Sequence, residues 1–254
     1  MGRAAGALVA AGVLVAGCGG GASKPQRAPA ARPAAKPRAV RPSTPVKRID
    51  GAVVPGGRGH LTAWVRRPAL LRTRPGGRPI ARLTPRTEFT SPRVMPVIAR
   101  RGRWLGVISS KAPNDRLGWV AASRVSLYRV AFSIEVSLAR RSVVVRRDGK
   151  VVQRFTVGVG SAATPTPTGR FAVTDKLVTR ASGGPYGCCI LALSGHQPHL
   201  REGWQGGDRI AIHGTDAPAS IGQAVSNGCL RAPESAIARA VRLVPIGTIV
   251  RIRG

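Results

Sequence analysis

The sequence predicts a mostly β chain in which a small β-barrel is followed by a β-sandwich. Apolar and polar residues alternate over 132–138, which is the pattern of a strand that buries one face. Asp148-Gly149 separates two apolar runs, and this dipeptide favours the tight turn of a β-hairpin. Over 60–128 several short apolar runs are broken by turn signals, which is typical of a small barrel or sandwich. We therefore expect one β module over 59–128 and a second, with short helices, over 129–254.

The first 17 residues have the layout of a secretory signal peptide. Met1-Gly2-Arg3 supplies a positive charge, and the apolar run over 4–16 is too short for a comfortable spanning helix. The run ends in Val15-Ala16-Gly17-Cys18, which resembles the bacterial lipobox. The resemblance implies that Cys18 carries lipid and anchors the exported protein to the membrane, facing the cell wall. An ordinary signal peptide is the alternative, and in both cases the chain leaves the cytosol.

Residues 18–58 are expected to be a disordered tether. The segment consists mainly of Ala, Pro, Gly and basic residues and has few large aliphatic side chains. Such a composition buries too little apolar surface to offset the entropy of ordering, and its prolines keep the chain extended. The tether would hold the two β modules away from the membrane.

The net charge of +31 arises from 41 Lys and Arg against 10 Asp and Glu. Nucleic-acid binders concentrate basic residues on one face and interleave aromatic residues for stacking. Here the basic residues are scattered and aromatic residues make up only 4% of the chain, so we expect no nucleic-acid partner. Anionic wall polymers and lipid headgroups are the partners that this charge favours.

Four cysteines are present, and their spacing predicts neither a disulfide framework nor a zinc site. Cys188 and Cys189 are adjacent and could pair only through a strained ring. We expect both to be small buried side chains rather than nucleophiles. Cys229 stands alone, and we expect no metal or other cofactor.

Two phrases in the first β module contain tryptophan: Gly102-Arg103-Trp104-Leu105-Gly106-Val107 and Leu117-Gly118-Trp119-Val120. They resemble the bacterial SH3-like modules found beside cell-wall enzymes, which implies a small barrel over 59–128. Trp104 and Trp119 either line a ligand groove or pack in the core, and the small size of the barrel favours the core.

Two phrases in the second module carry the chemistry: Arg209-Ile210-Ala211-Ile212-His213-Gly214-Thr215 and Ser226-Asn227-Gly228-Cys229-Leu230-Arg231. Cys229 lies 16 residues after His213. Together they resemble the signature of the L,D-transpeptidase catalytic domain, which has the YkuD-like fold. The resemblance extends to Pro165-Thr166-Pro167-Thr168-Gly169 and to Gly247-Thr248-Ile249-Val250, so it spans 129–254. Many members carry histidine where Asn227 stands, which leaves His213 as the expected catalytic histidine.

The residue types alone also predict a cysteine nucleophile. A thiol attacks as thiolate, and an adjacent imidazole generates or stabilises that state. His213 closes a β-like run, and Gly214 and Gly228 allow close approach of the backbone to a reacting carbonyl. Backbone N–H groups around Asn227, Gly228 and Cys229 would form an oxyanion hole.

The resemblance adds roles for several neighbours. It implies that the Gly214 carbonyl orients the His213 imidazole; Asp208 and Asp216 are alternative orienters, although loop solvation or helix capping explains them more simply. Arg231 is implied to hold the site or the donor peptide, the alternative being a surface arginine. The remaining site residues are Ser226, which positions the nucleophile loop, and Tyr186 and His196, which fall in a lid or substrate region.

A helix and a strand should follow the nucleophile. Pro233 begins a segment in which Ile237, Ala240, Val241 and Val244 repeat at helical spacing, and Pro245 ends it. We expect this helix to pack behind the nucleophile loop. The final strand is expected over 248–252.

The resemblance implies a transferase that acts on peptidoglycan stem peptides. The third residue of a tetrapeptide stem would acylate Cys229 with loss of D-Ala, and the side-chain amine of a second stem would form a 3→3 cross-link. Three alternatives remain: water as acceptor (an L,D-carboxypeptidase), a protein amine as acceptor (an anchoring enzyme), or a non-catalytic wall-binding module. The intact His213 and Cys229 argue against the last.

Overall fold

The computed structural model describes residues 38–39, 59–179, 184–200 and 207–254 of the 254-residue chain. The predicted signal peptide, Cys18 and all of the predicted tether except Arg38–Ala39 lie outside the described residues. Within the described residues no helix is both long enough and apolar enough to cross a membrane.

The first β module, here called the N-terminal module (residues 59–130), is a seven-stranded sheet with the order β4-β3-β7-β6-β5-β2-β8. Every neighbouring pair in it is antiparallel, and the expectation of several short strands in this segment is confirmed. Its elements are β2 His60–Val65, β3 Ala69–Arg72, β4 Pro79–Leu83, β5 Val94–Arg101, β6 Trp104–Val107, β7 Gly118–Ala121, the 3₁₀ turn η1 Ala122–Arg124 and β8 Val125–Val130.

The core of the N-terminal module is aliphatic and includes Leu71, Leu83, Leu105 and Val120. Trp119 is buried, as the core interpretation predicts, but Trp104 is only partly buried. The core prediction is therefore wrong in part for Trp104, because its ring stands at the surface with the Arg103 guanidinium 5.6 Å from the ring centroid.

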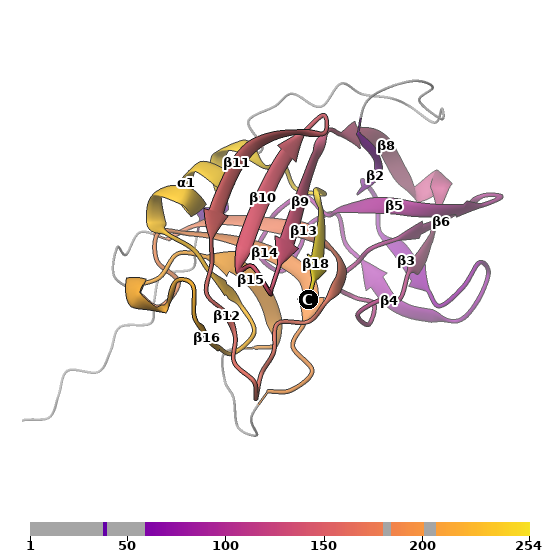
Figure 1. The fold of residues 1–254 in the computed structure, drawn as a ribbon. Helices are drawn as coiled ribbons and strands as arrows, with labels where there is room; N and C mark the ends of the chain where they lie inside the picture. The colour runs from indigo at the N-terminus through magenta and orange to yellow at the C-terminus, as the bar shows by residue number, and fades with distance from the viewer. Residues whose placement is uncertain (1–37, 40–58, 180–183, 201–206) are drawn as a thin grey trace, which may run out of the picture. The chain divides into compact units, whose positions relative to one another are not determined.

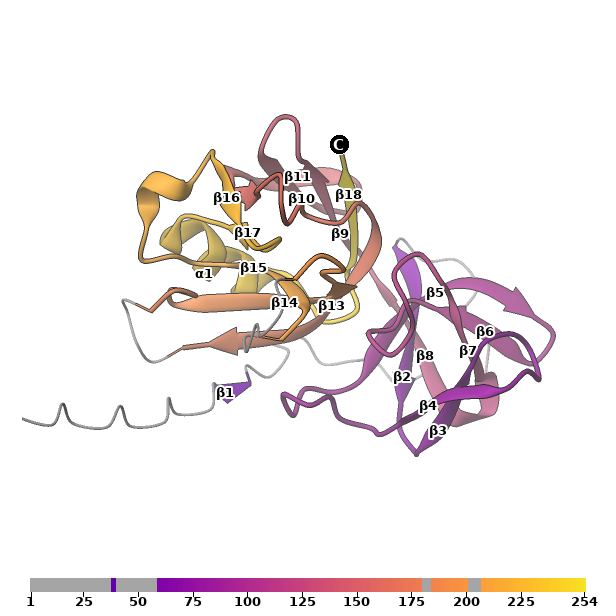
Figure 2. The same cartoon turned by 90° about the horizontal axis from the view of Figure 1, so that it is seen from below.

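The second module contains a nine-stranded sheet that curls into two layers (Figures 1 and 2). The strand order is β11-β10-β9-β18-β13-β14-β15-β17, and β1 (Arg38–Ala39) pairs with β13 off this path. The other strands are β9 Phe132–Ser137, β10 Ser142–Arg147, β11 Lys150–Thr156, β13 Gly169–Val178, β14 Cys189–His196, β15 Arg209–His213, β17 Leu230–Arg231 and β18 Ile249–Arg253. Two short strands, β12 Val159–Gly160 and β16 Ala224–Ser226, pair in parallel, and η2 Pro218–Ser220 is a 3₁₀ turn.

Strand β13 joins the two layers. Its first half, 169–172, pairs with β18, whereas its second half, from Val173 onward, pairs with β14. The register shifts between Val173 and Asp175, where a bulge bends the strand. One strand therefore belongs to both layers, and the apolar side chains of the two layers meet between them.

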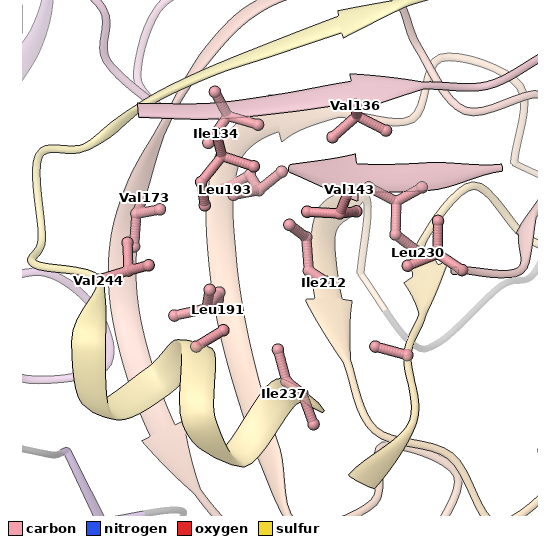
Figure 3. Packing of buried hydrophobic residues seen from close by; sticks show 14 of the residues in the cluster. Ile134, Val136, Val143, Val173, Leu191, Leu193, Ile212, Leu230, Ile237 and Val244 are labelled. Carbon is pink, nitrogen blue, oxygen red and sulfur yellow. The ribbon is translucent and has the colours of Figure 1, made fainter. Parts of the chain in front are cut away.

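Helix α1 (Glu234–Leu243) closes this core, as the helical spacing predicts. Ile237, Ala240 and Val241 are buried on its inner face, against β14. Figure 3 shows apolar side chains from the helix and from the strands directed into one space. Burial of this face stabilises a ten-residue helix that would be marginal in isolation.

The predicted hairpin is also confirmed. Strands β10 and β11 pair across Asp148-Gly149, and both residues have positive φ, 51° and 79°. Positive φ at both central positions is the geometry of a type I′ turn, which matches the twist of the flanking strands. Strand β8 continues to Val130, which pairs with His60.

The packing of α1 gives a stability prediction. Ile237→Ala should lower the free energy of unfolding by about 2–5 kcal/mol, because a fully buried aliphatic side chain leaves a cavity. Leu243→Ala is the matched control on the same helix, since Leu243 is 39% exposed and should cost about 1 kcal/mol or less. Urea unfolding of both variants measures the difference, and equal losses would contradict the described packing.

Candidate active site

Two short parallel strands bring the histidine phrase and the cysteine phrase together. Strand β15 pairs with β17 so that Ile212 faces Leu230 and His213 faces Arg231. The N–H of Ala232 donates to the His213 carbonyl at 2.8 Å, which extends the pairing beyond β17. The sheet therefore places the imidazole on the strand beside the one that follows Cys229, and both side chains line one pocket.

The His213 ring is buried, with 4% of the residue exposed. Its Nδ1 lies 2.5 Å from the Gly214 carbonyl oxygen, which can only accept, so Nδ1 carries the proton of the neutral ring. Nε2 is then the unprotonated nitrogen. Burial lowers the pKa of His213, and the nearby Arg231 charge lowers it further, whereas the hydrogen bond to the Gly214 carbonyl raises it. The ring is thus neutral at pH 7 and able to take a proton at Nε2.

Two further contacts fix this imidazole. The Tyr186 ring packs edge-on against it, with centroids 4.9 Å apart and planes at 67°. On the other side of the Gly214 peptide, the Glu234 carboxylate accepts hydrogen bonds from the N–H groups of Cys188 and Thr215, each at 2.7 Å. A Cβ at Gly214 would lie 2.1 Å from Glu234 Oε1, so any other residue there would displace the carboxylate. Glu234 therefore braces the backbone that orients the histidine.

The sequence interpretation did not include Glu234. It stands directly after Pro233 at the start of α1, where an acidic residue is ordinary. Partial burial by itself would raise the pKa of Glu234. Hydrogen bonds from Cys188 and from the Thr215 N–H, together with the charge interaction with His213, instead hold this pKa below its usual value. The carboxylate is therefore ionised across the neutral range.

Cys229 is partly buried, and its thiol points back at β15. The Sγ atom lies 3.9 Å from the Arg209 carbonyl oxygen, which is a long contact acceptable for sulfur. Burial raises the pKa of Cys229, while hydrogen bonding with the Ala211 backbone and the Arg231 charge oppose the rise. The resting site therefore holds a thiol beside a neutral imidazole rather than an ion pair.

The loop that carries Cys229 is held from inside by Ser226. The hydroxyl of this buried serine donates to the Cys229 carbonyl at 2.6 Å and accepts from the Gly228 N–H at 3.1 Å. The Gly228 N–H is consequently not free for an oxyanion, contrary to the expectation from the sequence. The N–H groups of Asn227 and Cys229 make no hydrogen bond within the described part of the chain, which leaves them as the candidate donors.

Gln197 contacts the outer side of the loop that carries Cys229. The sequence interpretation did not single out this residue. Its buried amide nitrogen lies 3.2, 2.9 and 3.4 Å from the carbonyl oxygens of Thr164, Pro165 and Asn227. Gly228 has φ of +108°, and a Cβ there would lie 2.2 Å from the Gln197 amide nitrogen. Glycine is therefore required at 228 for both conformation and space.

The threonine-proline loop supports the same segment. Thr164 Oγ1 donates to the Ser226 carbonyl at 3.0 Å, and the Ser161 N–H donates to that carbonyl at 2.9 Å. Thr166 Oγ1 accepts from the Gly160 N–H at 2.9 Å. The loop thus forms the rigid back of the nucleophile segment.

Neither acidic alternative orients His213, although Asp208 lines the same pocket. Asp208 Oδ2 is 2.8 Å from Nδ1 of His196, and the His196 Nε2 is 2.9 Å from the Ser110 carbonyl oxygen. His196 therefore faces the N-terminal module and does not line the pocket that holds Cys229. The Gly214 carbonyl is the group that meets Nδ1 of His213, and Asp216 makes no hydrogen bond to it.

Residues 131–252 match the family described as YkuD, the L,D-transpeptidase catalytic domain. The chain is 34% identical over 125 residues to the putative L,D-transpeptidase YkuD of Bacillus subtilis, which covers 49% of this chain and 68% of that protein. The chain belongs to the YkuD family of L,D-transpeptidases. The corresponding protein of Bacillus licheniformis is 33% identical over 123 residues, covering 48% of this chain and 66% of that protein.

Solved structures of L,D-transpeptidases are also similar to this chain. A variant of the Enterococcus faecium enzyme has 23% identity and a TM-score of 0.37, with coverage of 49% of this chain and 50% of that one. L,D-transpeptidase 3 of Mycobacterium tuberculosis has 16% identity and a TM-score of 0.41, with coverage of 55% of this chain and 72% of that one. The chain therefore spans about half the length of the first of these structures.

The cleft of this L,D-transpeptidase domain gathers the residues predicted from the sequence with several that were not. Predicted residues at its surface are Tyr186, His213, Ser226, Asn227, Cys229 and Arg231, together with Asp208, which was considered as an orienter; the others are Pro185, Gln197, Leu200, Gly207, Arg209 and Ile210. The Arg231 backbone N–H and carbonyl both pair with Gly158, so its position is fixed. Arg231 therefore places a positive charge at the cleft.

Cys188 and Cys189 are unpaired thiols in the L,D-transpeptidase domain. Cys189 is buried and Cys188 is half-buried, with its Sγ 3.7 Å from the Glu234 carbonyl oxygen. Burial is the main cause that raises the pKa of each thiol, so neither is an activated nucleophile. No group of three His, Cys, Asp or Glu side chains suited to a metal ion occurs in the described residues.

The contact between Gly228 and Gln197 gives a second prediction. Gly228→Ala should slow acylation of Cys229 by about 10²-fold, because the displaced loop loses the geometry of its N–H donors. Gly222→Ala is the matched control: Gly222 also has positive φ, +80°, but the nearest atom to a Cβ there is Thr156 Cγ2 at 3.7 Å. Acylation by a β-lactam, followed by mass spectrometry, measures both rates. Similar rates in the two variants would show that backbone strain, not the Gln197 contact, is what matters.

Proposed function

We propose that the chain is a peptidoglycan L,D-transpeptidase that forms 3→3 cross-links through a thioester on Cys229. The observation that carries the proposal is the pairing of β15 with β17, which brings a neutral His213 and the Cys229 thiol to one pocket. Family membership supports the same substrate class, the peptides of peptidoglycan.

The first half-reaction acylates the cysteine. His213 Nε2 takes the proton of Cys229 as the sulfur attacks the carbonyl of the third residue in a tetrapeptide stem. The oxyanion is stabilised by the Asn227 and Cys229 N–H groups. When the tetrahedral intermediate collapses, the C–N bond breaks and the departing D-Ala amine receives the proton from Nε2. The products are a thioester and free D-Ala.

The second half-reaction transfers the acyl group. The side-chain amine of another stem attacks the thioester carbonyl, the C–S bond breaks, and the proton of the amine passes through His213 to the sulfur. This restores the thiol and leaves a new amide bond. The Arg231 charge at the cleft suits the carboxylates of stem peptides, and the Gly214–Glu234 brace holds His213 in the same tautomer through both steps.

The choice of acceptor is the point that an experiment must decide. Enzyme lacking residues 1–50 would be incubated with a disaccharide tetrapeptide. We expect a dimer lighter than two donors by one D-Ala, because a cleft that excludes water preserves the thioester until an amine arrives. Cys229→Ala and His213→Ala should abolish the product while leaving the unfolding transition in place. Tripeptide alone would indicate a carboxypeptidase, a product formed only with a protein amine would indicate an anchoring enzyme, and no acyl-enzyme at all would indicate a wall-binding module.

The two half-reactions should differ in pH dependence. Acylation needs neutral His213, whose pKa lies below the ordinary 6.5 because the ring is buried, so the acylation rate should fall only as the pH drops below that value. Transfer needs a neutral acceptor amine, whose unperturbed pKa is about 10, so dimer formation should keep rising through the neutral range. The acylation rate and the dimer yield, each measured over a range of pH, give the two profiles. An acid limb for acylation above pH 6.5 would contradict the neutral imidazole.

We also propose that Cys18 carries a lipid anchor and that the N-terminal module is SH3-like. The lipobox sequence Val15-Ala16-Gly17-Cys18 supports the first, and the seven short antiparallel strands with their tryptophan phrases support the second. The anchor, with the positive charge of the chain, would hold the enzyme at the membrane and near anionic wall polymers.

Cys18→Ala tests the anchor. The substituted protein should leave the membrane fraction for the soluble extracellular fraction, because without the Cys18 thiol the acyl chains of the proposed anchor cannot be attached. Fractionation and intact-mass measurement of the wild type check the result. Unchanged partitioning together with an unacylated wild type would reject the anchor.

A further inference from the structure

A carboxylate of the N-terminal module makes a short contact with an arginine of the catalytic cleft. Arg209 Nη1 lies 2.6 Å from Glu88 Oε1. The other two guanidinium nitrogens are also engaged: Nε donates to the Leu193 carbonyl at 2.9 Å, and Nη2 donates to that carbonyl at 2.5 Å and to Thr174 Oγ1 at 2.7 Å. Every nitrogen of the side chain therefore makes a hydrogen bond within the protein, which fixes its position.

Arg209 holds the strand beside the nucleophile. It is the first residue of β15, it lines the cleft, and its carbonyl oxygen is the one that Cys229 Sγ approaches at 3.9 Å. Its side chain is only 17% exposed, so its charge needs a counter-charge. Glu88 supplies that charge from outside the domain, since the residue belongs to the loop between β4 and β5.

A second contact links the N-terminal module to the nucleophile loop through His196 and Gln197. The side-chain amide of Asn114 donates to the His196 carbonyl at 2.7 Å and accepts from the His196 N–H at 2.9 Å. The Asn114 amide therefore binds both backbone groups of His196, as a neighbouring strand would do at the end of β14. The next residue is Gln197, whose amide nitrogen contacts the carbonyls of Pro165 and Asn227.

The surroundings of these contacts are polar, and several of the groups are buried, whereas Glu88 itself is 38% exposed and also lies 3.9 Å from Lys111. Thr87 of the N-terminal module donates a hydrogen bond to Asp175 of β13, which is fully buried. Arg93 is also buried and lies 4.0 Å from Glu88. Charged groups buried with partners on both sides resist separation, because parting them leaves an uncompensated charge.

We infer that the N-terminal module is a positioning element of the active site, with Glu88 acting through Arg209 and Asn114 acting through His196 and Gln197. Neither residue touches the reacting atoms. They hold the first residue of β15 and the outer side of the loop over 226–229. The consequence for catalysis rests on the proposed function, whereas the consequence for the geometry of the loop does not.

The test uses full-length Glu88→Gln and Asn114→Ala, with Glu135→Gln as the matched control. Glu135 also pairs with an arginine, Arg146 at 3.3 Å, but lies on the exposed β9–β10 ladder. Acylation by a carbapenem gives a first-order rate constant and an apparent affinity, and amide resonances report the backbone of Gly228 and Cys229. We expect Glu88→Gln and Asn114→Ala to lower the first-order constant by about tenfold, the scale of one hydrogen bond to a charged or buried group, with affinity within about twofold.

In both variants the amide resonances of Gly228 and Cys229 should move, and in Glu135→Gln they should stay in place. Wild-type resonances together with first-order constants within about twofold of wild type, in both variants, would overturn the inference. Thermal melting shows whether a variant reacts slowly because it has unfolded. If Glu88→Gln unfolds, Asn114→Ala, which removes no charge, decides whether the N-terminal module positions the loop. A wild type that is never acylated would reject the proposed function, and the resonances alone would still decide the positioning role.

Discussion

The active site depends on the parallel pairing of β15 with β17. Two residue pairs place His213 beside Arg231, two residues after Cys229, and the backbone of Arg231 is also hydrogen-bonded to Gly158. Three side chains complete the site around this pairing. Glu234 braces the Gly214 peptide, Gln197 occupies the space beside Gly228, and Ser226 closes the loop from within.

Burial determines the charge state in which the site rests. Removing His213 and Cys229 from water disfavours the imidazolium and the thiolate, so both groups are neutral before substrate arrives. The Arg231 charge lowers the pKa of both groups. It therefore favours the thiolate that forms during attack and disfavours a protonated histidine at rest. Proton transfer then coincides with attack, as general-base catalysis requires.

Local patterns predicted much of the fold and the two central residues of the site. The alternation over 132–138, the Asp148-Gly149 turn and the spacing of Ile237 and Val241 all correspond to observed elements. Glu234 was missed because an acidic residue at a helix start has a local explanation, and Gln197 because its partners lie 30 or more residues away. Glu88 is 121 residues from Arg209, a pairing that no local pattern encodes. What the sequence could not supply is the tertiary environment that gives an ordinary side chain its role.

Strand β13 also couples the two layers of the catalytic module when the module unfolds. Its first half belongs to the layer with β18 and its second half to the layer with β14, and its residues Thr174 and Asp175 contact Arg209 and Thr87. Neither layer can melt without breaking the ladder of this one strand. Opening of either layer therefore disturbs a strand that the other layer also uses. A disturbance that begins at β18 is carried along β13 to Thr174, and from there to Arg209 at the edge of the cleft.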